Sequence, residues 1–453
     1  MTFSTKPRTN IIKSVFTRRN TATQEMRLHS LTWKWSIVMM TTATLLRISP
    51  TFGYSLLVQI TSRQHVAFNL LLGKRFTSHF REIKRSTSSH FRWLSSANGD
   101  ELYQELKERK TRLVFLGTPD VAAESLLSLI EESKKSRSCF DIVGVVSQPP
   151  KRRKRKGQPE PTPVGKVAEE HEIPFIFTPE KASDPVFLDF LEQEVRPDIC
   201  ITAAYGQYLP KRFLSMPPLG TVNIHPSLLP RWRGASPVQR SLEAGDNPIG
   251  VSLLYTVSKM DAGPIICKTE YDVGPNEQAT EVLAHLFRLG TKSLLECLPD
   301  IVSGDISFDT ASPQQEDQVV KADMIQVSEG ELKPWETSAT IAHNKVRALS
   351  IWPGTWMYFK IGESDELVRV KVVETRVLNK IIENNDVSAK QVRLGPEKGS
   401  GLEVVFHDGT ILELLKVQPE TKKVMDAKSF WNGLRGQSLD WVDLSMKPTI
   451  TVQ

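Results

Sequence analysis

The chain has 453 residues, of which 40% are hydrophobic and 24% charged, a composition typical of globular proteins and unlike that of disordered chains. This length is sufficient for two or three domains with cores of their own. The net charge is +6. The four cysteines form no C-x-x-C pair, so the sequence argues against a zinc site or a disulfide framework and favours a reducing compartment.

The basic charge is concentrated in the first hundred residues. They hold fifteen Lys or Arg against Glu25, Glu82 and Asp100, a balance of +12, whereas the remainder of the chain carries −6. The segment is also rich in Ser and Thr, as mitochondrial and plastid transit peptides are. Its longest apolar stretch, 36–46, is shorter than the roughly 20 residues that a membrane span needs. We therefore predict a transit peptide over 1–108 that directs the protein to the mitochondrial matrix, with a plastid as the alternative, and no membrane association. A disordered extension, or a start codon assigned too far upstream, stays open.

From about residue 111, short apolar runs alternate with helical patterns. The run 112–116 predicts a strand, and Thr118 and Pro119 after it predict the N-cap and first turn of a helix. Further apolar runs lie at 142–146, 173–177 and 198–204, with a short helix predicted at 164–170. Apolar strands that alternate with helices are typical of a parallel sheet covered on both faces. Because the first turn lacks G-x-G-x-x-G, we predict an α/β, Rossmann-like domain with a mostly parallel sheet and no dinucleotide site.

Two polar side chains interrupt the strand predicted at Thr221–His225. Val222 and Ile224 alternate with Asn223 and His225, and a period of two sends the apolar pair to one face and the carboxamide and imidazole to the other. Open α/β sheets bind ligands at the carboxyl ends of their strands. Asn223 and His225 are therefore candidate functional residues, with an edge strand and a solvated polar face as the alternative.

The residues around this strand resemble a known family. Asn223-x-His225 is followed by Ser227-Leu228-Leu229-Pro230 and an Arg-Gly pair, which resembles the signature of the 10-formyltetrahydrofolate-dependent formyltransferases. The methionyl-tRNA formyltransferases are the most similar, through blocks at 117–120, 203–206, 230–235, 237–240, 244–246 and 260–263. The resemblance implies a formyltransferase catalytic domain over 109–308 and a smaller, OB-like β-barrel domain over 336–453 that binds tRNA, with a purely structural cap as the alternative for the barrel. We predict a linker between them, over 309–335.

The resemblance assigns catalysis to Asn223, His225 and Asp261. In a formyl transfer, the Asn223 amide would donate to the developing oxyanion, and His225 would stabilise that charge as imidazolium or pass a proton. Asp261 follows an alternating strand predicted at 251–257, and it would orient His225, relay protons through water or take the amine proton. A turn residue is the alternative for Asp261. No metal is implied.

A loop over Ser227, Leu228, Leu229 and Pro230 resembles the segment along which the co-substrate 10-formyltetrahydrofolate lies. The two leucines would offer apolar surface to the pterin ring, and backbone amides would read its edge; core leucines in a buried loop are the alternative. Arg231 and Arg233 would attract folate carboxylates or tRNA phosphates, or be plain surface charges.

A basic run at 151–156 occupies the place of a loop that contacts tRNA in the bacterial-type enzymes. It contains Arg152, Arg153, Lys154 and Arg155, which we predict to contact RNA phosphates. The sequence of the loop differs from the family pattern at 158–160, so the resemblance does not assign a tRNA contact to any single residue of the loop. A solvated loop or a nuclear-localisation-like patch stays open.

The C-terminal part carries a helix predicted at about 280–298, a Ser/Gln/Asp-rich stretch at 303–317 and a strand predicted at 367–373. Apolar runs at 403–406 and 411–414 flank Asp408-Gly409 as a hairpin. Together these features predict a monomeric enzyme that transfers the formyl group of 10-formyltetrahydrofolate to the free amino group of initiator methionyl-tRNA for organellar translation. The alternatives are another 10-formyltetrahydrofolate-dependent formyltransferase or hydrolase, or a catalytically silent relative that binds tRNA or folate.

Overall fold

The computed structural model describes residues 109–152, 157–382 and 390–444. The predicted transit peptide over 1–108 and four residues of the basic run, Arg153, Lys154, Arg155 and Lys156, lie outside these ranges.

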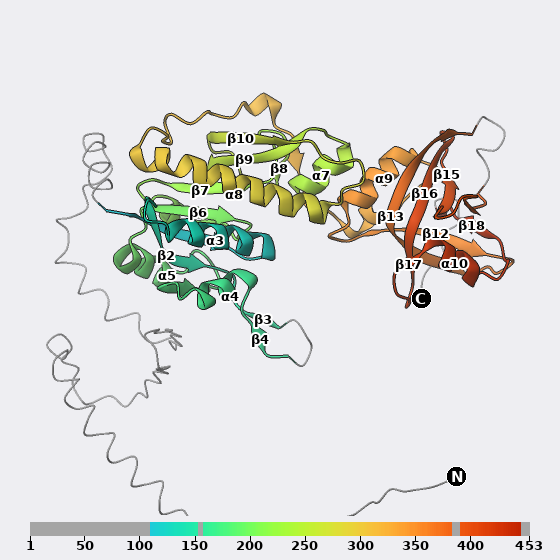
Figure 1. The fold of residues 1–453 in the computed structure, drawn as a ribbon, viewed down its shortest axis with the longest axis horizontal. Helices are drawn as coiled ribbons and strands as arrows, with labels where there is room; N and C mark the ends of the chain where they lie inside the picture. Colours follow the sequence, from blue (N-terminus) through green and yellow to red (C-terminus); the bar gives the residue numbers. More distant parts are fainter. Residues whose placement is uncertain (1–108, 153–156, 383–389, 445–453) are drawn as a thin grey trace, which may run out of the picture. The chain divides into compact units, whose positions relative to one another are not determined.

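A seven-stranded sheet forms the centre of the catalytic domain (Figure 1), in the order β10-β9-β7-β6-β1-β2-β5. Strands β5, β2, β1, β6 and β7 are parallel, whereas β9 is antiparallel to both of its neighbours, which confirms the predicted mostly parallel sheet. The strands are β1 (Thr111–Gly117), β2 (Phe140–Val146), β5 (Phe175–Phe177), β6 (Ile199–Ala203), β7 (Thr221–His225), β9 (Ile249–Tyr255) and β10 (Ile265–Tyr271).

Helices cover both faces of this sheet, as predicted. Leu113 and Phe115 of β1 pack with α3, α4 and α8 on one face, and Val114 and Leu116 pack with α5 and α6 on the other. Alternate side chains of β1 are therefore buried on opposite faces of the sheet, so both faces of the strand are apolar. The helices of this domain are α3 (Asp120–Ser133), α4 (Pro163–Glu170), α5 (Pro185–Phe190), α6 (Lys211–Leu214), α7 (Pro237–Ala244) and α8 (Ala279–Ser303), with a π-helical turn at Leu191–Val195 after α5.

Two local predictions are wrong. Thr118 does not cap α3: Pro119 is the N-cap residue, and the Thr118 hydroxyl instead donates to the carbonyl of Tyr205, at 2.9 Å. Strand β9 does not alternate between buried and exposed residues, because every residue from Ile249 to Tyr255 is buried between β7 and β10. In both cases a contact with a distant segment overrides the local pattern.

The C-terminal domain is a nearly closed antiparallel barrel with strands in the order β14-β15-β16-β13-β12-β18. Val405 of β15 pairs with Ile411 of β16, which confirms the hairpin predicted around Asp408-Gly409. Backbone hydrogen bonds from Val392 to Leu439 and from Trp441 to Lys390 bring the two ends of the sheet together. The elements are α9 (Ala339–Ala348), β12 (Thr355–Ile361), β13 (Leu367–Ile381), β14 (Arg393–Leu394), β15 (Leu402–Val405), β16 (Thr410–Pro419), β17 (Met425–Asp426), α10 (Ala427–Gly433) and β18 (Leu439–Trp441).

The segment between the two domains has secondary structure of its own and pairs with a strand of the catalytic domain. It contains short helical turns at Glu316–Gln318 and Val327–Gly330 and a strand, β11 (Lys321–Ala322), that pairs with β8 (Arg233–Gly234). The Ser/Gln/Asp-rich composition predicted a linker here but did not indicate this pairing. The segment therefore contributes to the surface next to the loop that follows β7.

Candidate active site

Strand β7 holds Asn223 and His225 at the middle of the sheet. Val222 and Ile224 are buried in the core beneath α8, so the two polar side chains lie on the opposite face, as the period of two predicted. Because β7 runs between β6 and β9, the strand is not at an edge, and the alternative of a solvated edge strand is wrong.

Thr202 orients the amide of Asn223. It lies beside Asn223 on β6 and donates a hydrogen bond of 2.7 Å from its hydroxyl to the carboxamide oxygen. Since the oxygen accepts this bond, the NH₂ group is the part of the amide that can donate to a ligand, and an oxyanion requires such a donor. Sequence reasoning missed Thr202, because a threonine near the end of a buried strand carries no signal of its own.

The ring of His225 lies between two acceptors. Its Nε2 is 3.2 Å from the carbonyl oxygen of Trp232, and its Nδ1 is 3.8 Å from Oδ1 of Asp261. The second distance is too long for a direct hydrogen bond, so a water molecule or a small movement would complete it. His225 is only 4% exposed. Both ring nitrogens therefore face oxygens to which an imidazolium could donate.

Asp261 reaches this position from an unusual loop between β9 and β10. Its φ of +48° is in the left-handed region, which non-glycine residues rarely adopt. At Gly263 an added Cβ would stand 1.7 Å from the carbonyl oxygen of Tyr255, so the backbone tolerates no side chain there. The tertiary structure thus brings Asp261 to His225, a proximity that the sequence predicted only through the family resemblance.

The loop after β7 divides the predicted folate-binding residues into two groups. Leu229 is fully buried against Leu254 and Ile265, which corresponds to the alternative of a core leucine. Ser227 is also buried, and its carbonyl accepts a hydrogen bond of 2.7 Å from Ser252. Leu228 and Pro230 are half-buried, and they retain surface that a ligand can contact.

Both arginines of this loop form contacts within the chain. Arg231 forms a two-pronged pair with Asp246 at 2.7 and 2.9 Å, and these hydrogen bonds raise the pKa of Arg231. Arg233 is 7% exposed and donates to Gln314 and Glu316. Arg233 is therefore not a plain surface charge.

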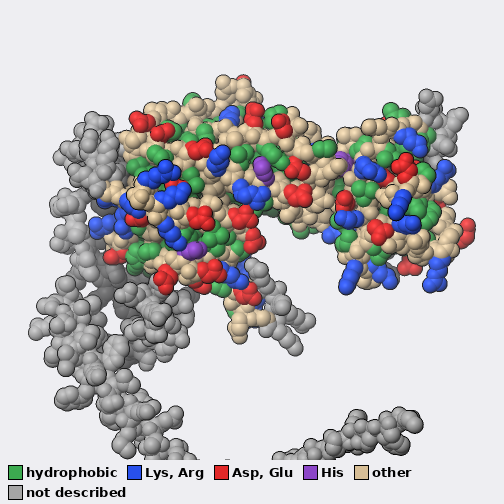
Figure 2. Space-filling view, in the orientation of Figure 1, with side chains coloured by type: hydrophobic (Ala, Val, Ile, Leu, Met, Phe, Trp, Pro, Cys, Tyr) green, Lys and Arg blue, Asp and Glu red, His purple; other side chains and the backbone are tan. Residues whose placement is uncertain are grey.

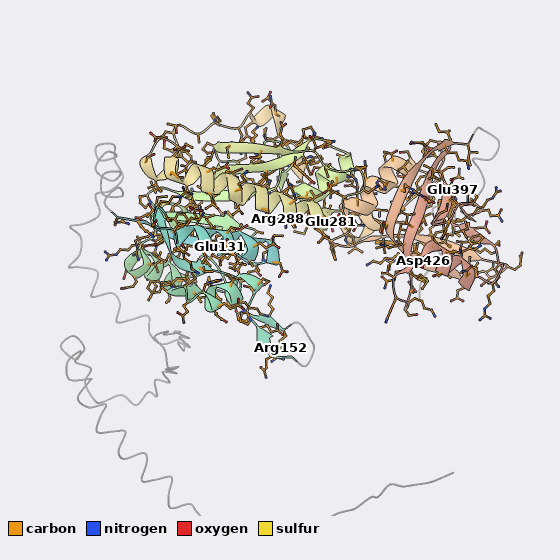
Figure 3. The ribbon with its side chains drawn as sticks, in the orientation of Figure 1. Glu131, Arg152, Glu281, Arg288, Glu397 and Asp426 are labelled. Carbon is orange, nitrogen blue, oxygen red and sulfur yellow. The ribbon has the colours of Figure 1, made fainter. Side chains whose placement is uncertain are left out.

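A cavity of about 600 Å³ opens at the carboxyl end of the sheet, lined by 148–151, 180–183 and 206–208. Lys151 and Arg152 form β3 (Lys151–Arg152), which pairs with β4 (Pro159–Glu160) as a two-stranded ribbon. Figure 3 shows the Arg152 side chain on this ribbon, beyond α4. Lys151 donates to Gln148 at 2.9 Å, so the basic run starts at the rim of the cavity.

The described residues hold neither a cluster of candidate metal ligands nor a candidate membrane-spanning helix. No group of three or more His, Cys, Asp or Glu side chains converges there. No helix in these ranges is long and apolar enough to cross a membrane.

Comparisons with known proteins add family relationships to this geometry. A family described as formyl transferase matches residues 111–298, and its C-terminal domain matches residues 324–435. The chain is 42% identical over 243 residues to a methionyl-tRNA formyltransferase of Thermotoga maritima, over 54% of this chain and 74% of that protein. It is 34% identical over 323 residues to a methionyl-tRNA formyltransferase of Symbiobacterium thermophilum, over 71% of this chain and 92% of that protein. An N-formyltransferase structure from Helicobacter canadensis matches with a TM-score of 0.48 and 13% identity, over 68% of this chain and 99% of that one.

Proposed function

The chain belongs to the methionyl-tRNA formyltransferase family, and on that premise we propose the roles of its residues and its place in the cell. The enzyme transfers the formyl group of 10-formyltetrahydrofolate to the free amino group of methionyl-tRNA. One observation carries the assignment of the site: Oδ1 of Asp261 lies 3.8 Å from Nδ1 of His225. His225 and Asn223 both lie at the end of β7.

The reaction forms one carbon–nitrogen bond and breaks another. The methionyl nitrogen attacks the formyl carbon, negative charge develops on the formyl oxygen, and the bond to the folate nitrogen then breaks as that nitrogen gains a proton. The NH₂ group of Asn223, held by Thr202, stabilises the oxyanion. His225 stabilises the same charge or moves the proton, and Asp261 holds the ring on its Nδ1 side and accepts the proton of the amine through water.

We assign the folate side of the site to the loop after β7. Leu228 and Pro230 are the half-buried members of this loop, and they offer the apolar surface that a flat pterin ring requires. Leu229 and Ser227 support the loop from the core. Leu229 donates its backbone N–H to the Ser252 hydroxyl at 3.0 Å, and this bond holds the loop against β9.

A formylation assay tests the function directly. With 10-formyltetrahydrofolate as the donor, we expect the protein to formylate initiator methionyl-tRNA faster than elongator methionyl-tRNA, and to leave glycinamide ribonucleotide unmodified. Formylation of the ribonucleotide alone would indicate a different member of the wider formyltransferase group. Folate or tRNA binding without turnover on any acceptor would indicate a silent relative.

The basic run is proposed to contact the tRNA. Figure 2 shows acidic and basic side chains interspersed over the catalytic domain on the face in view. The run at 151–156 consists of six consecutive cations, and this density makes it our candidate for phosphate binding. Neutralising Arg152, Arg153, Lys154 and Arg155 together should raise KM for methionyl-tRNA about tenfold and flatten its dependence on salt, because each lost phosphate contact reduces counterion release. KM for 10-formyltetrahydrofolate should hardly change. The measurement is steady-state kinetics at two ionic strengths with each substrate varied in turn.

A matched control is available at the opposite end of the strands, where the chain leaves α3 and enters the amino end of β2. Lys134, Lys135 and Arg137 are exposed after α3, and their neutralisation should leave KM for tRNA and its salt dependence as in the parent enzyme. If the two sets of variants behave alike, the run at 151–156 is only solvated surface. If the folate KM changes instead, the run lies on the folate side of the site.

We propose that the enzyme works as a monomer in the mitochondrial matrix, with a plastid as the alternative. The family match begins at residue 111, and the first hundred residues before it carry a balance of +12, as expected for a transit peptide. A fluorescent reporter fused after Asp100 should therefore enter mitochondria or plastids in living cells. A diffuse cytosolic signal from both this fusion and the full-length protein would contradict the proposal.

A further inference from the structure

The segment after α8 is attached to the catalytic domain on both sides of Gln314. Ser312 and Ile265 exchange two backbone hydrogen bonds of 2.7 and 2.9 Å. Further along, the N–H of Arg233 donates to the carbonyl of Val320 at 2.9 Å, where β8 and β11 begin to pair. These bonds bring the segment next to the loop that carries Asp261.

The side chain of Gln314 connects this segment to the Asp261 loop. Its Nε2 donates to the carbonyl oxygens of Asp261 and Gly263, both at 2.8 Å. Its Oε1 accepts a hydrogen bond of 2.8 Å from the guanidinium of Arg233. Because a guanidinium can only donate, the bond to Arg233 determines the orientation of the amide, with its NH₂ group toward the loop.

Arg233 is itself held from a second direction. Its other terminal nitrogen is 3.0 Å from Oε1 of Glu316, and Oε2 of Glu316 is 2.7 Å from Nζ of Lys259. Lys259 is two residues before Asp261 in the chain. A chain of ion pairs and hydrogen bonds therefore begins at Lys259 and passes through Glu316, Arg233 and Gln314. It ends at the carbonyls of Asp261 and Gly263 in the same loop.

The Asp261 loop requires external support of this kind. A left-handed φ at a non-glycine residue persists only where the surrounding structure determines it, and Asp261 adopts such a φ of +48°. Gln314 binds the carbonyl of Asp261 and the carbonyl two residues later. Both bonds therefore act on the part of the backbone that sets the direction of the carboxylate toward His225.

We propose that Gln314 is a positioning residue for the formyl transfer, which holds the Asp261 carboxylate toward His225 from outside the catalytic domain proper. This proposal rests on the proposed role of Asp261. It makes the segment between the two domains part of the active site, so that the first domain without this segment would lack a support of its catalytic loop.

The test compares Gln314→Ala with Asp261→Asn and with the double variant. Gln314→Ala should lower kcat about tenfold, since a displacement of about 1 Å costs up to 100-fold in rate, while KM for both substrates changes less than about twofold. In the Asp261→Asn background the same change should have almost no further effect on kcat, because the loop then has no carboxylate to position. The dependence of kcat on pH should shift in Gln314→Ala relative to the parent enzyme.

Gln315→Ala is the matched control, because Gln315 is the exposed neighbour of Gln314 in the same segment; it should behave as the parent enzyme. Gln314→Glu keeps the acceptor for Arg233 but removes both donors to the loop, and it should be impaired at least as much as the alanine variant. If the alanine variant does not fold, Gln314→Met retains the length of the side chain and allows the same comparison.

Two results would overturn the proposal: unchanged kcat in folded Gln314→Ala while Asp261→Asn is impaired, or equal losses from Gln314→Ala in both backgrounds. Unchanged kcat in Asp261→Asn itself would be a different failure, because it would remove the proposed role of Asp261.

Discussion

Replacement of His225 by alanine should lower kcat by about two orders of magnitude or more, as expected when a positioned proton-transfer group is lost. The ring lies between the Asp261 carboxylate and the Trp232 carbonyl. The loss should appear in kcat, since binding of the folate is assigned to the loop after β7. Single-turnover formylation of methionyl-tRNA at saturating co-substrate measures the effect.

Because His225 is 4% exposed, its variant also needs a measurement of folding. Thermal unfolding and binding of the folate co-substrate should remain close to those of the parent enzyme, while turnover falls. His171 is exposed at the end of α4, and His171→Ala serves as the control for a histidine away from the site. Near-normal turnover in a folded His225→Ala enzyme would refute the catalytic role.

The second large effect is expected for Asn223→Ala, which should lower kcat by roughly 100- to 1,000-fold, the usual cost of removing one donor to an oxyanion. The side chain is half-buried, and because its oxygen accepts the hydrogen bond from Thr202, its NH₂ group is the donor that we propose for the formyl oxygen. KM for either substrate should change much less than kcat, because the bond from the amide forms fully only when charge develops on the formyl oxygen.

Graded variants distinguish orientation from presence of the donor. Thr202→Val retains the shape of the side chain but removes the hydroxyl, so its kcat should lie between those of the parent enzyme and Asn223→Ala, and Thr202→Ser should restore most of the activity. Asn276→Ala, at an exposed position, controls for the loss of an asparagine elsewhere. A kcat of Asn223→Ala within a fewfold of the parent value would contradict the oxyanion role.

Local patterns in the sequence predicted much of the fold and part of the site. The apolar run of β1 and the alternation in β7 depend on neighbouring residues only, and they correctly predicted a strand and the faces of Asn223 and His225. The hairpin at Asp408-Gly409 follows from turn chemistry over a few residues. The roles predicted for Asn223, His225 and Asp261 depended on the resemblance to a known family, because residue types alone do not identify a reaction.

Contacts between distant segments were decided only by the tertiary structure. Thr202 orients Asn223 from the neighbouring strand, and Gln314 reaches the Asp261 loop from 53 positions further along the chain. Cys267 and Cys297, which form no motif in the sequence, have sulfur atoms 3.8 Å apart in the folded chain. Arg233 is an arginine whose role as a buried partner of Gln314 depends on the pairing of β8 with β11.

The difference has a physical cause. A strand or a turn is determined by the backbone preferences and the polarity of a few consecutive residues, and these are written in the sequence. A hydrogen bond between side chains forms only if the packing of whole elements brings donor and acceptor within about 3 Å. The sequence by itself therefore determined where the strands run and which residue types their ends carry. The pairing of β6 with β7 and the packing of the 309–335 segment on the β9–β10 loop decided which side chains bind Asn223 and the backbone of Asp261.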